Sequence, residues 1–177
     1  MKRNDCNIKN CLRTTHKPSD FLWFLLLGGI PYLIGAIAIG SYSIPWMLGY
    51  LAFSLPFAAS EIRFLCSHCP YYTQQKGRTV HCKAMWGPTK WAKARPGPLS
   101  SFEKAMLYLF FLLAFAFPMY WLVLRPELLV LYLITIINMA WTLRRYECPR
   151  CMFFNCPFNC VPKSVKDDFL KENEGKK

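Results

Sequence analysis

Four long stretches of this 177-residue chain contain no Asp, Glu, Lys, Arg or His: residues 21–39, 44–60, 105–124 and 128–143. Helices buried in a soluble protein normally keep a polar stripe along one face, and these stretches have none. At about 1.5 Å rise per residue, the longer two match the roughly 30 Å hydrocarbon core of a bilayer, and the shorter two can borrow a flanking residue. We therefore expect an all-α integral membrane protein with four transmembrane helices arranged as two hairpins.

The absence of ionisable side chains and of common motifs also narrows the function. Ion and proton pathways are usually marked by ionisable residues inside the membrane, so a proton-coupled transporter or an ion pump is disfavoured. The chain contains no nucleophile elbow, phosphate-binding glycine loop, dinucleotide fingerprint or Cys-x2-Cys-His haem attachment motif. The absence of these motifs leaves open whether the protein is an enzyme.

Acidic side chains are scarce, with 10 Asp and Glu against 22 Lys and Arg, for a net charge of +12. The excess lies in three polar segments, residues 1–20 (+3), 61–104 (+6) and 144–177 (+3), whereas the two hairpin turns are neutral overall. Cytoplasmic segments of membrane proteins are enriched in Lys and Arg. We therefore place both termini and the central loop in the cytosol, with transmembrane hairpins at 21–60 and 105–143. The basic segments should attract anionic lipid, and no nucleic-acid partner is expected because the central loop is too short for a recognition fold.

All nine cysteines lie in these three polar segments. Four of them, Cys148, Cys151, Cys156 and Cys160, follow the fourth apolar stretch within 13 residues. A Cys-x2-Cys turn presents two sulfurs to one ion, so four such thiols can close a tetrahedral zinc site or hold an iron–sulfur cluster. Because the spacing differs from the ferredoxin pattern, it predicts a metal without predicting a particular family.

The central loop supplies a second set of metal-binding residue types. Cys66 and Cys69 begin shortly after the second apolar stretch, and His81 and Cys82 follow. The three thiols could form one site with His81 or with His68. Alternatively, the Cys-x2-Cys pair of the loop could join the Cys-x2-Cys pair of the tail in one four-thiol site. The sequence leaves both arrangements open.

Both an iron–sulfur cluster and zinc suit these ligands. Cys-Pro pairs recur at three cysteines, bulky apolar residues separate the tail thiols, and the thiols outnumber the needs of one zinc ion, which together favour the cluster. Disulfides are disfavoured because the cytosol is reducing. Cys6 and Cys11, five residues apart in the N-terminal arm, are expected to be unpaired.

These features lead to three hypotheses about function. The favoured one is a redox module in which an iron–sulfur cluster passes electrons between a partner protein and a quinone or a larger membrane complex with other protein subunits. The second is a structural or assembly subunit whose loop and tail are stapled by zinc. The third is a metal-dependent membrane enzyme that acts at the lipid interface, with His81 or a metal-bound water in its chemistry.

Local patterns make further predictions. Ser100 and Glu103 have the spacing of a capping box that opens the third helix. Pro31 and Pro118 lie inside apolar stretches and should kink the first and third helices. Residues 86–91, aromatic and basic, are expected to form a short element at the membrane interface.

Overall fold

The computed structural model describes residues 12–73 and 77–174, with the backbone alone at 173–174. Cys6 and Cys11 lie outside the described residues. The helices are α2 (Pro18–Gly40), α3 (Ile44–Ser60), α4 (Pro70–Thr73), α5 (Ser101–Ala116), α6 (Met119–Val123), α7 (Pro126–Thr142) and α8 (Lys163–Glu174). Two strands, β1 (Thr79–His81) and β2 (Trp86–Thr89), lie in the central loop. Helix α3 continues into a π-helical turn, η1 (Glu61–Leu65), and a 3-10 turn, η2 (Cys66–His68), and α7 likewise continues into η3 (Leu143–Glu147) and η4 (Cys148–Arg150).

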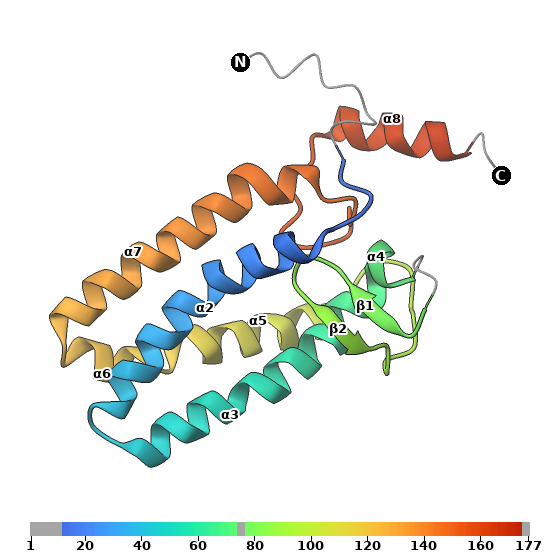
Figure 1. Ribbon diagram of the computed structural model, residues 1–177. Helices are drawn as coiled ribbons and strands as arrows, with labels where there is room; N and C mark the ends of the chain where they lie inside the picture. The colour runs from blue at the N-terminus through green and yellow to red at the C-terminus, as the bar shows by residue number, and fades with distance from the viewer. Residues whose placement is uncertain (1–11, 74–76, 175–177) are drawn as a thin grey trace.

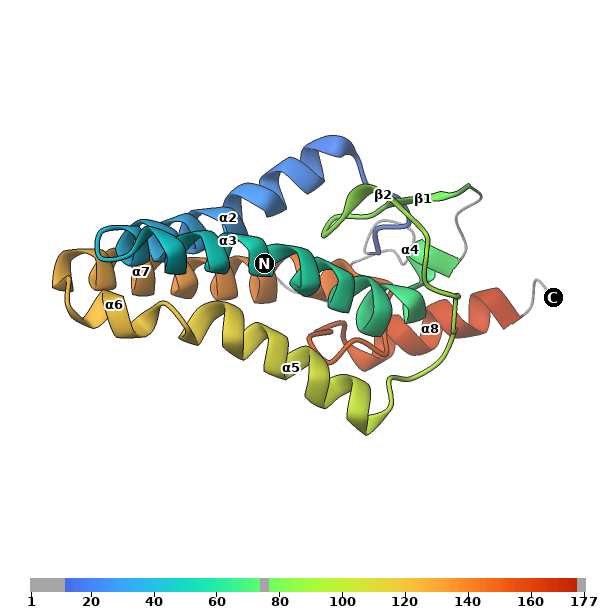
Figure 2. The same cartoon turned by 90° about the horizontal axis from the view of Figure 1, so that it is seen from below.

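Four long helices run side by side, and the described parts of the three basic segments lie at one end of them (Figures 1 and 2). Helix α2 packs against α3 and α7, and α3 packs against α5. The α2–α3 turn and α6 lie at one end, whereas β1, β2, α4 and α8 lie at the other. We call this second end, formed by residues 12–17, 61–100 and 144–174, the headpiece.

Three helices are long and apolar enough to cross a membrane: Pro18–Gly40, Ser101–Val123 and Pro126–Arg150, with mean hydropathies of 2.1, 2.0 and 1.6. This finding supports the predicted helical membrane protein. Helix α3, with 17 residues before its π-helical continuation, is not one of these three. Only 6% of the apolar window in the third helix is buried, so most of its surface is available to lipid.

Pro118 breaks the third apolar stretch into α5 and α6, as predicted. Proline has no backbone N–H, so the carbonyl of Ala114 loses its helical donor, and the break leaves the carbonyl of Phe115 in the same position. Two tyrosines replace the missing donors. The Tyr50 hydroxyl of α3 donates to the Ala114 carbonyl at 2.8 Å, and the Tyr132 hydroxyl of α7 donates to the Phe115 carbonyl at 2.7 Å. The proline break is therefore the point at which α3, α5 and α7 are hydrogen-bonded together.

Helix α2 approaches the same break through a glycine. A β-carbon at Gly35 would lie 3.0 Å from Cβ of Pro118, tighter than nearly all such contacts, so a side chain there would push the helices apart. The Tyr32 hydroxyl, also on α2, donates to the Tyr50 carbonyl. Pro31 lies inside α2 without interrupting it, unlike Pro118.

The headpiece joins all three polar segments. The backbone amide of Arg13 donates to the Arg150 carbonyl at 2.9 Å, which links the N-terminal arm to the tail. The Tyr71 hydroxyl of the central loop donates to the Arg13 carbonyl. Lys83 of the loop forms an ion pair with Glu147 of the tail. Because each segment bonds to the other two, the segments before α2 and after α3 meet at the same end of the bundle.

An antiparallel hairpin in the headpiece was not expected from the sequence. Thr79 pairs with Thr89, and His81 pairs with Trp86, with an irregularity between the two pairs. The fold is thus not purely helical, and residues 86–89 of the expected interfacial element form strand β2. Val80 is fully buried, which places one face of β1 in the headpiece core.

Candidate metal centre

The two Cys-x2-Cys turns have nearly the same backbone. Each follows a π-helical turn that ends a long helix, and each starts in a 3-10 turn. Leu65 and Glu147, which precede the first cysteines, have φ/ψ of −110°/−56° and −105°/−53°. The second cysteines, Cys69 and Cys151, have φ/ψ of −80°/134° and −87°/125°. Both halves of the chain therefore present a cysteine pair in the same way at the same end of the bundle, and π-helical turns are frequent at functional sites.

The loop cysteines gather in the headpiece core. Cys66 and Cys82 are buried there, and Cys69 packs against the same core. Cys66 donates a hydrogen bond to the Cys82 sulfur. That bond is the largest cause of the opposite shifts of the pair, since it raises the pKa of Cys66 and lowers the pKa of Cys82 to about 7. Burial raises the pKa of Cys69, with smaller contributions from the neighbouring thiols.

The tail contributes Cys151 to this group. Cys151 packs against the same core as the loop cysteines. Burial raises the pKa of Cys151, and the Cys82 thiolate adds to that effect. Cys151 in turn contributes to the raised pKa of Cys69. The structure thus brings Cys66, Cys69, Cys82 and Cys151 together from three parts of the chain.

The remaining tail cysteines lie next to Cys151. Burial raises the pKa of Cys148 to about 11 and that of Cys156 to about 12, and each of these thiols also interacts electrostatically with Cys151. The Cys160 amide donates to the Cys148 carbonyl at 3.4 Å, but the Cys160 side chain is exposed. The seven cysteines in the described part of the chain are all free thiols.

Backbone amides are directed at four of the sulfurs. In each case the amide lies two residues after the cysteine. At Cys69, Cys151 and Cys156 it lowers the thiol pKa, which burial raises. At Cys82 it lowers the thiol pKa further than the hydrogen bond from Cys66 does alone. The amides are those of Tyr71 for Cys69, Ala84 and Met85 for Cys82, Phe153 for Cys151, and Phe158 for Cys156. The amides of Tyr72 and Asn159 donate to the carbonyls of Cys69 and Cys156 at 3.0 Å. Such donors stabilise a thiolate, which is the form of cysteine that binds metals.

The sulfurs are neighbours without forming a coordination sphere. Within residues 12–73 and 77–174, no three Cys, His, Asp or Glu side chains lie close enough together to hold one ion. Occupancy by a metal would therefore require the thiols to move toward a common centre.

Charged groups surround the thiols on two sides. Glu61, at the start of η1, has its pKa raised to about 8, mainly by burial and further by the Cys82 thiolate. Lys83 lowers the pKa of Cys148 and Cys151, although burial raises both overall. The Lys83–Glu147 ion pair, whose side chains are 12% and 14% exposed, was not anticipated from the sequence. The sequence contains one indication of this ion pair: Glu147 directly precedes Cys148, and Lys83 directly follows Cys82.

The structure places His81 apart from the thiols. Its ring packs on Trp86, with the centroids 4.8 Å apart, and a ring nitrogen lies 3.3 Å from the Thr79 hydroxyl. Neighbouring residues of a strand point to opposite faces, so His81 faces away from the core that holds Val80 and Cys82.

His68 instead belongs to a buried polar network. One ring nitrogen lies 3.3 Å from the Gly97 carbonyl, and the other lies 3.4 Å from Glu103. Glu103 also forms a 2.7 Å ion pair with Arg95 and completes the predicted capping box with Ser100. Burial alone would raise the pKa of Glu103, but the hydrogen bonds from Ser100 and His68 lower it. The network clamps the chain before α5 onto the first Cys-x2-Cys turn.

Comparison with known proteins gives no family model, no curated protein and no solved structure that matches this chain.

Proposed function

We propose that this protein crosses the membrane four times and holds a cysteine-bound metal at its cytoplasmic face, as an electron-transfer module. The observation that carries the proposal is the gathering of Cys66, Cys69, Cys82 and Cys151 from both halves of the chain, with backbone amides directed at three of them. These four thiols are the first choice of ligands. Cys148, Cys156 and Cys160 are adjacent enough to complete a second site or to exchange with them, and His81 is the least favoured of the predicted ligands.

The contacts of the headpiece support a fourth crossing by α3. If α2 crosses the membrane, the turn after Gly40 lies on the far side. Tyr71, which follows α3, bonds to Arg13, which precedes α2, so the chain must return to the first side between them. Helix α3 lies between α2 and α5 and is the segment that makes this return. The basic excess of the headpiece segments supports a cytoplasmic location for them.

An iron–sulfur cluster is the favoured metal group. Seven free thiols in the headpiece exceed the four that one zinc ion needs. The buried side chains of Tyr71, Met152 and Phe153 pack beside the thiols and would shield a cluster from water. Other protein subunits or a quinone would then be the electron partners.

A zinc staple is the second candidate, and one observation favours it. The four gathered thiols come from the loop and from the tail, so a single ion bound to all four would cross-link these segments. Metal binding would then contribute directly to folding of the headpiece. For the lipid-interface enzyme, the packing of His81 on Trp86 leaves a metal-bound water as the reactive group, and no contact among the described residues of the headpiece favours this candidate over the other two.

Elemental analysis and a visible spectrum of anaerobically purified protein test the proposal. We expect iron and sulfide with absorbance near 400 nm, and a paramagnetic resonance signal after reduction. The variant Cys151→Ser should lose the metal, whereas Cys160→Ser, which changes an exposed thiol, should keep it. Colourless protein with stoichiometric zinc would establish the staple instead. Protein that binds neither metal would refute both candidates.

A further inference from the structure

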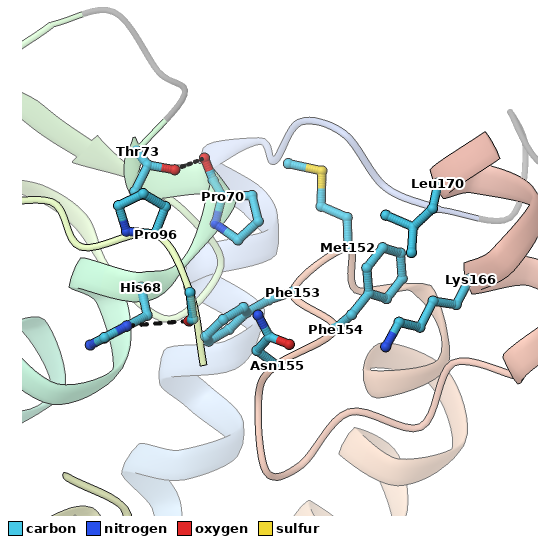
Figure 3. A pocket seen from close by; sticks show the side chains of 11 residues that line it. His68, Pro70, Thr73, Pro96, Met152, Phe153, Phe154, Asn155, Lys166 and Leu170 are labelled. Atoms are coloured by element: carbon cyan, nitrogen blue, oxygen red, sulfur yellow. Dashed lines mark hydrogen bonds between the residues drawn. The ribbon is translucent and has the colours of Figure 1, made fainter. Parts of the chain in front are cut away.

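A cavity of about 330 Å³ lies in the headpiece, next to the segments that follow the two Cys-x2-Cys turns (Figure 3). Its walls come from four segments that are far apart in the sequence: the η2–α4 segment, the turn at residues 96–97, the tail at residues 152–155, and α8. Pro70 and Met152 in its wall directly follow Cys69 and Cys151. A molecule bound in this cavity would therefore sit beside the gathered thiols.

The walls combine apolar and polar surface in nearly equal parts. Met152 and Phe153 are 8% and 4% exposed, so they form a buried part of the wall, and Phe154 and Pro70 contribute further apolar surface. The volume lies at the lower end of the range for small-molecule sites, about 300–1,000 Å³. A flat molecule of two fused rings has the size and surface that such walls accommodate.

One positive charge distinguishes the cavity from an apolar gap. The Lys166 side chain extends from α8 toward Phe154 and Asn155 in Figure 3, and its ammonium lies 5.7 Å from the centre of the Phe154 ring. Among the described residues, no acidic side chain lines the cavity, and no carboxylate lies within 4 Å of the Lys166 ammonium. Both ring nitrogens of His68 already face protein oxygens, so Lys166 is the group left to meet a ligand's charge.

We propose that this cavity binds a small planar aromatic anion. The rings of the ligand pack against Met152, Phe153 and Phe154, and its anionic group pairs with Lys166. An aromatic body satisfies the apolar walls, and a single negative charge complements the unpaired ammonium. The proposal concerns binding alone and does not depend on the metal.

Calorimetric titration of the purified full chain in detergent with naphthalene-2-sulfonate tests this site. The variant Lys166→Met keeps most of the stem and removes the charge, and we expect it to weaken binding about 5- to 10-fold. The control is Lys163→Met, which changes an exposed lysine of the same helix that does not line the cavity, and it should stay within about 2-fold of the wild type. Uncharged naphthalene-2-sulfonamide should bind the wild type and Lys166→Met equally.

A second variant keeps the test independent of charge. Asn155 is exposed and lines the cavity, so Asn155→Trp should fill the cavity and abolish binding of both probes while the far-ultraviolet circular dichroism stays unchanged. Equal losses for Lys166→Met and Lys163→Met, or full binding by Asn155→Trp, would overturn the site. Metal content measured on the same samples separates the two proposals. Metal-loaded protein that does not bind the probe overturns the cavity site alone, and metal-free protein that binds it upholds the cavity site alone.

Discussion

The hydrogen bond from Tyr50 to the carbonyl of Ala114 offers a quantitative test of how the bundle is held together. Tyr50→Phe removes only the hydroxyl, so the ring contacts with Tyr32 and Phe117 remain. The Ala114 carbonyl would then have neither its helical donor, which Pro118 eliminates, nor the tyrosine. Because Tyr50 is only 3% exposed, water cannot readily replace the lost donor.

The expected cost follows from two known ranges. Leaving a buried carbonyl without a partner costs about 1–3 kcal/mol in protein interiors. Interhelical hydrogen bonds in membranes average about 0.6 kcal/mol and reach about 1.7 kcal/mol. The carbonyl of Ala114 has no alternative donor on its own helix, so we expect the upper part of the membrane range, about 1–1.7 kcal/mol. Tyr120→Phe is the matched control, since Tyr120 is 71% exposed on α6, and it should change stability by less than about 0.5 kcal/mol.

A double-mutant cycle makes the reasoning refutable. The free energy of unfolding is measured by titrating dodecyl sulfate into mixed micelles and following tryptophan fluorescence. Pro118→Ala restores an N–H at residue 118 that can donate to the Ala114 carbonyl, so Tyr50→Phe should cost less than about 0.5 kcal/mol in that background. An equal cost in both backgrounds would show that the hydroxyl does not compensate for the proline.

Two further substitutions probe other close contacts. Gly35→Leu should destabilise the bundle by about 1–3 kcal/mol in the same assay, because its β-carbon would meet Pro118 at 3.0 Å, whereas Gly29→Leu, with no atom within 4 Å of the corresponding position, should be nearly neutral. Glu103→Gln should cost about 1–2 kcal/mol at pH 7, because it removes the charge that pairs with Arg95 at 2.7 Å. Since the pKa of Glu103 is lowered in the folded state, this stabilisation is complete above the unfolded-state pKa of about 4.3 and is lost as the pH falls through the lower folded pKa. Thermal unfolding of wild type and variant should therefore converge only below that folded pKa.

Composition predicts the helices well because, in a membrane, a single unbroken apolar stretch can satisfy its backbone hydrogen bonds only as a helix. The second stretch, residues 44–60, coincides with α3, and the fourth, 128–143, differs from α7 by one or two residues at each end. The break at Pro118 and the capping box at Ser100 follow from local rules that need no knowledge of the tertiary structure. Both features depend only on residues that are close together in the sequence, so they can be predicted from the sequence alone.

The hairpin and the arrangement of the thiols depend on contacts between distant residues. Strand β1 has three residues, and β2 contains Pro88, so neither matches a strand pattern in isolation. Spacing predicts that Cys148 and Cys151 belong together, but it cannot show that Cys151 also lies beside Cys69. That proximity follows from the way α3 and α7 end at the same level of the bundle, and no local pattern encodes it.

The position of the thiols is therefore coupled to the packing of the bundle. The first Cys-x2-Cys turn continues from α3 and the second continues from α7, so the distance between them depends on how these helices pack. In lipid, apolar contact alone does not fix helix positions, because lipid tails solvate apolar side chains equally well. The hydrogen bonds of Tyr50 and Tyr132 to adjacent carbonyls of α5 are specific contacts that fix α3 and α7 to a common helix. Removing both hydroxyls should consequently loosen the relation between the two cysteine turns, although each turn keeps its own backbone geometry. If the gathered thiols bind a metal, the double variant Tyr50→Phe/Tyr132→Phe should bind it more weakly than either single variant, at a site that neither tyrosine touches.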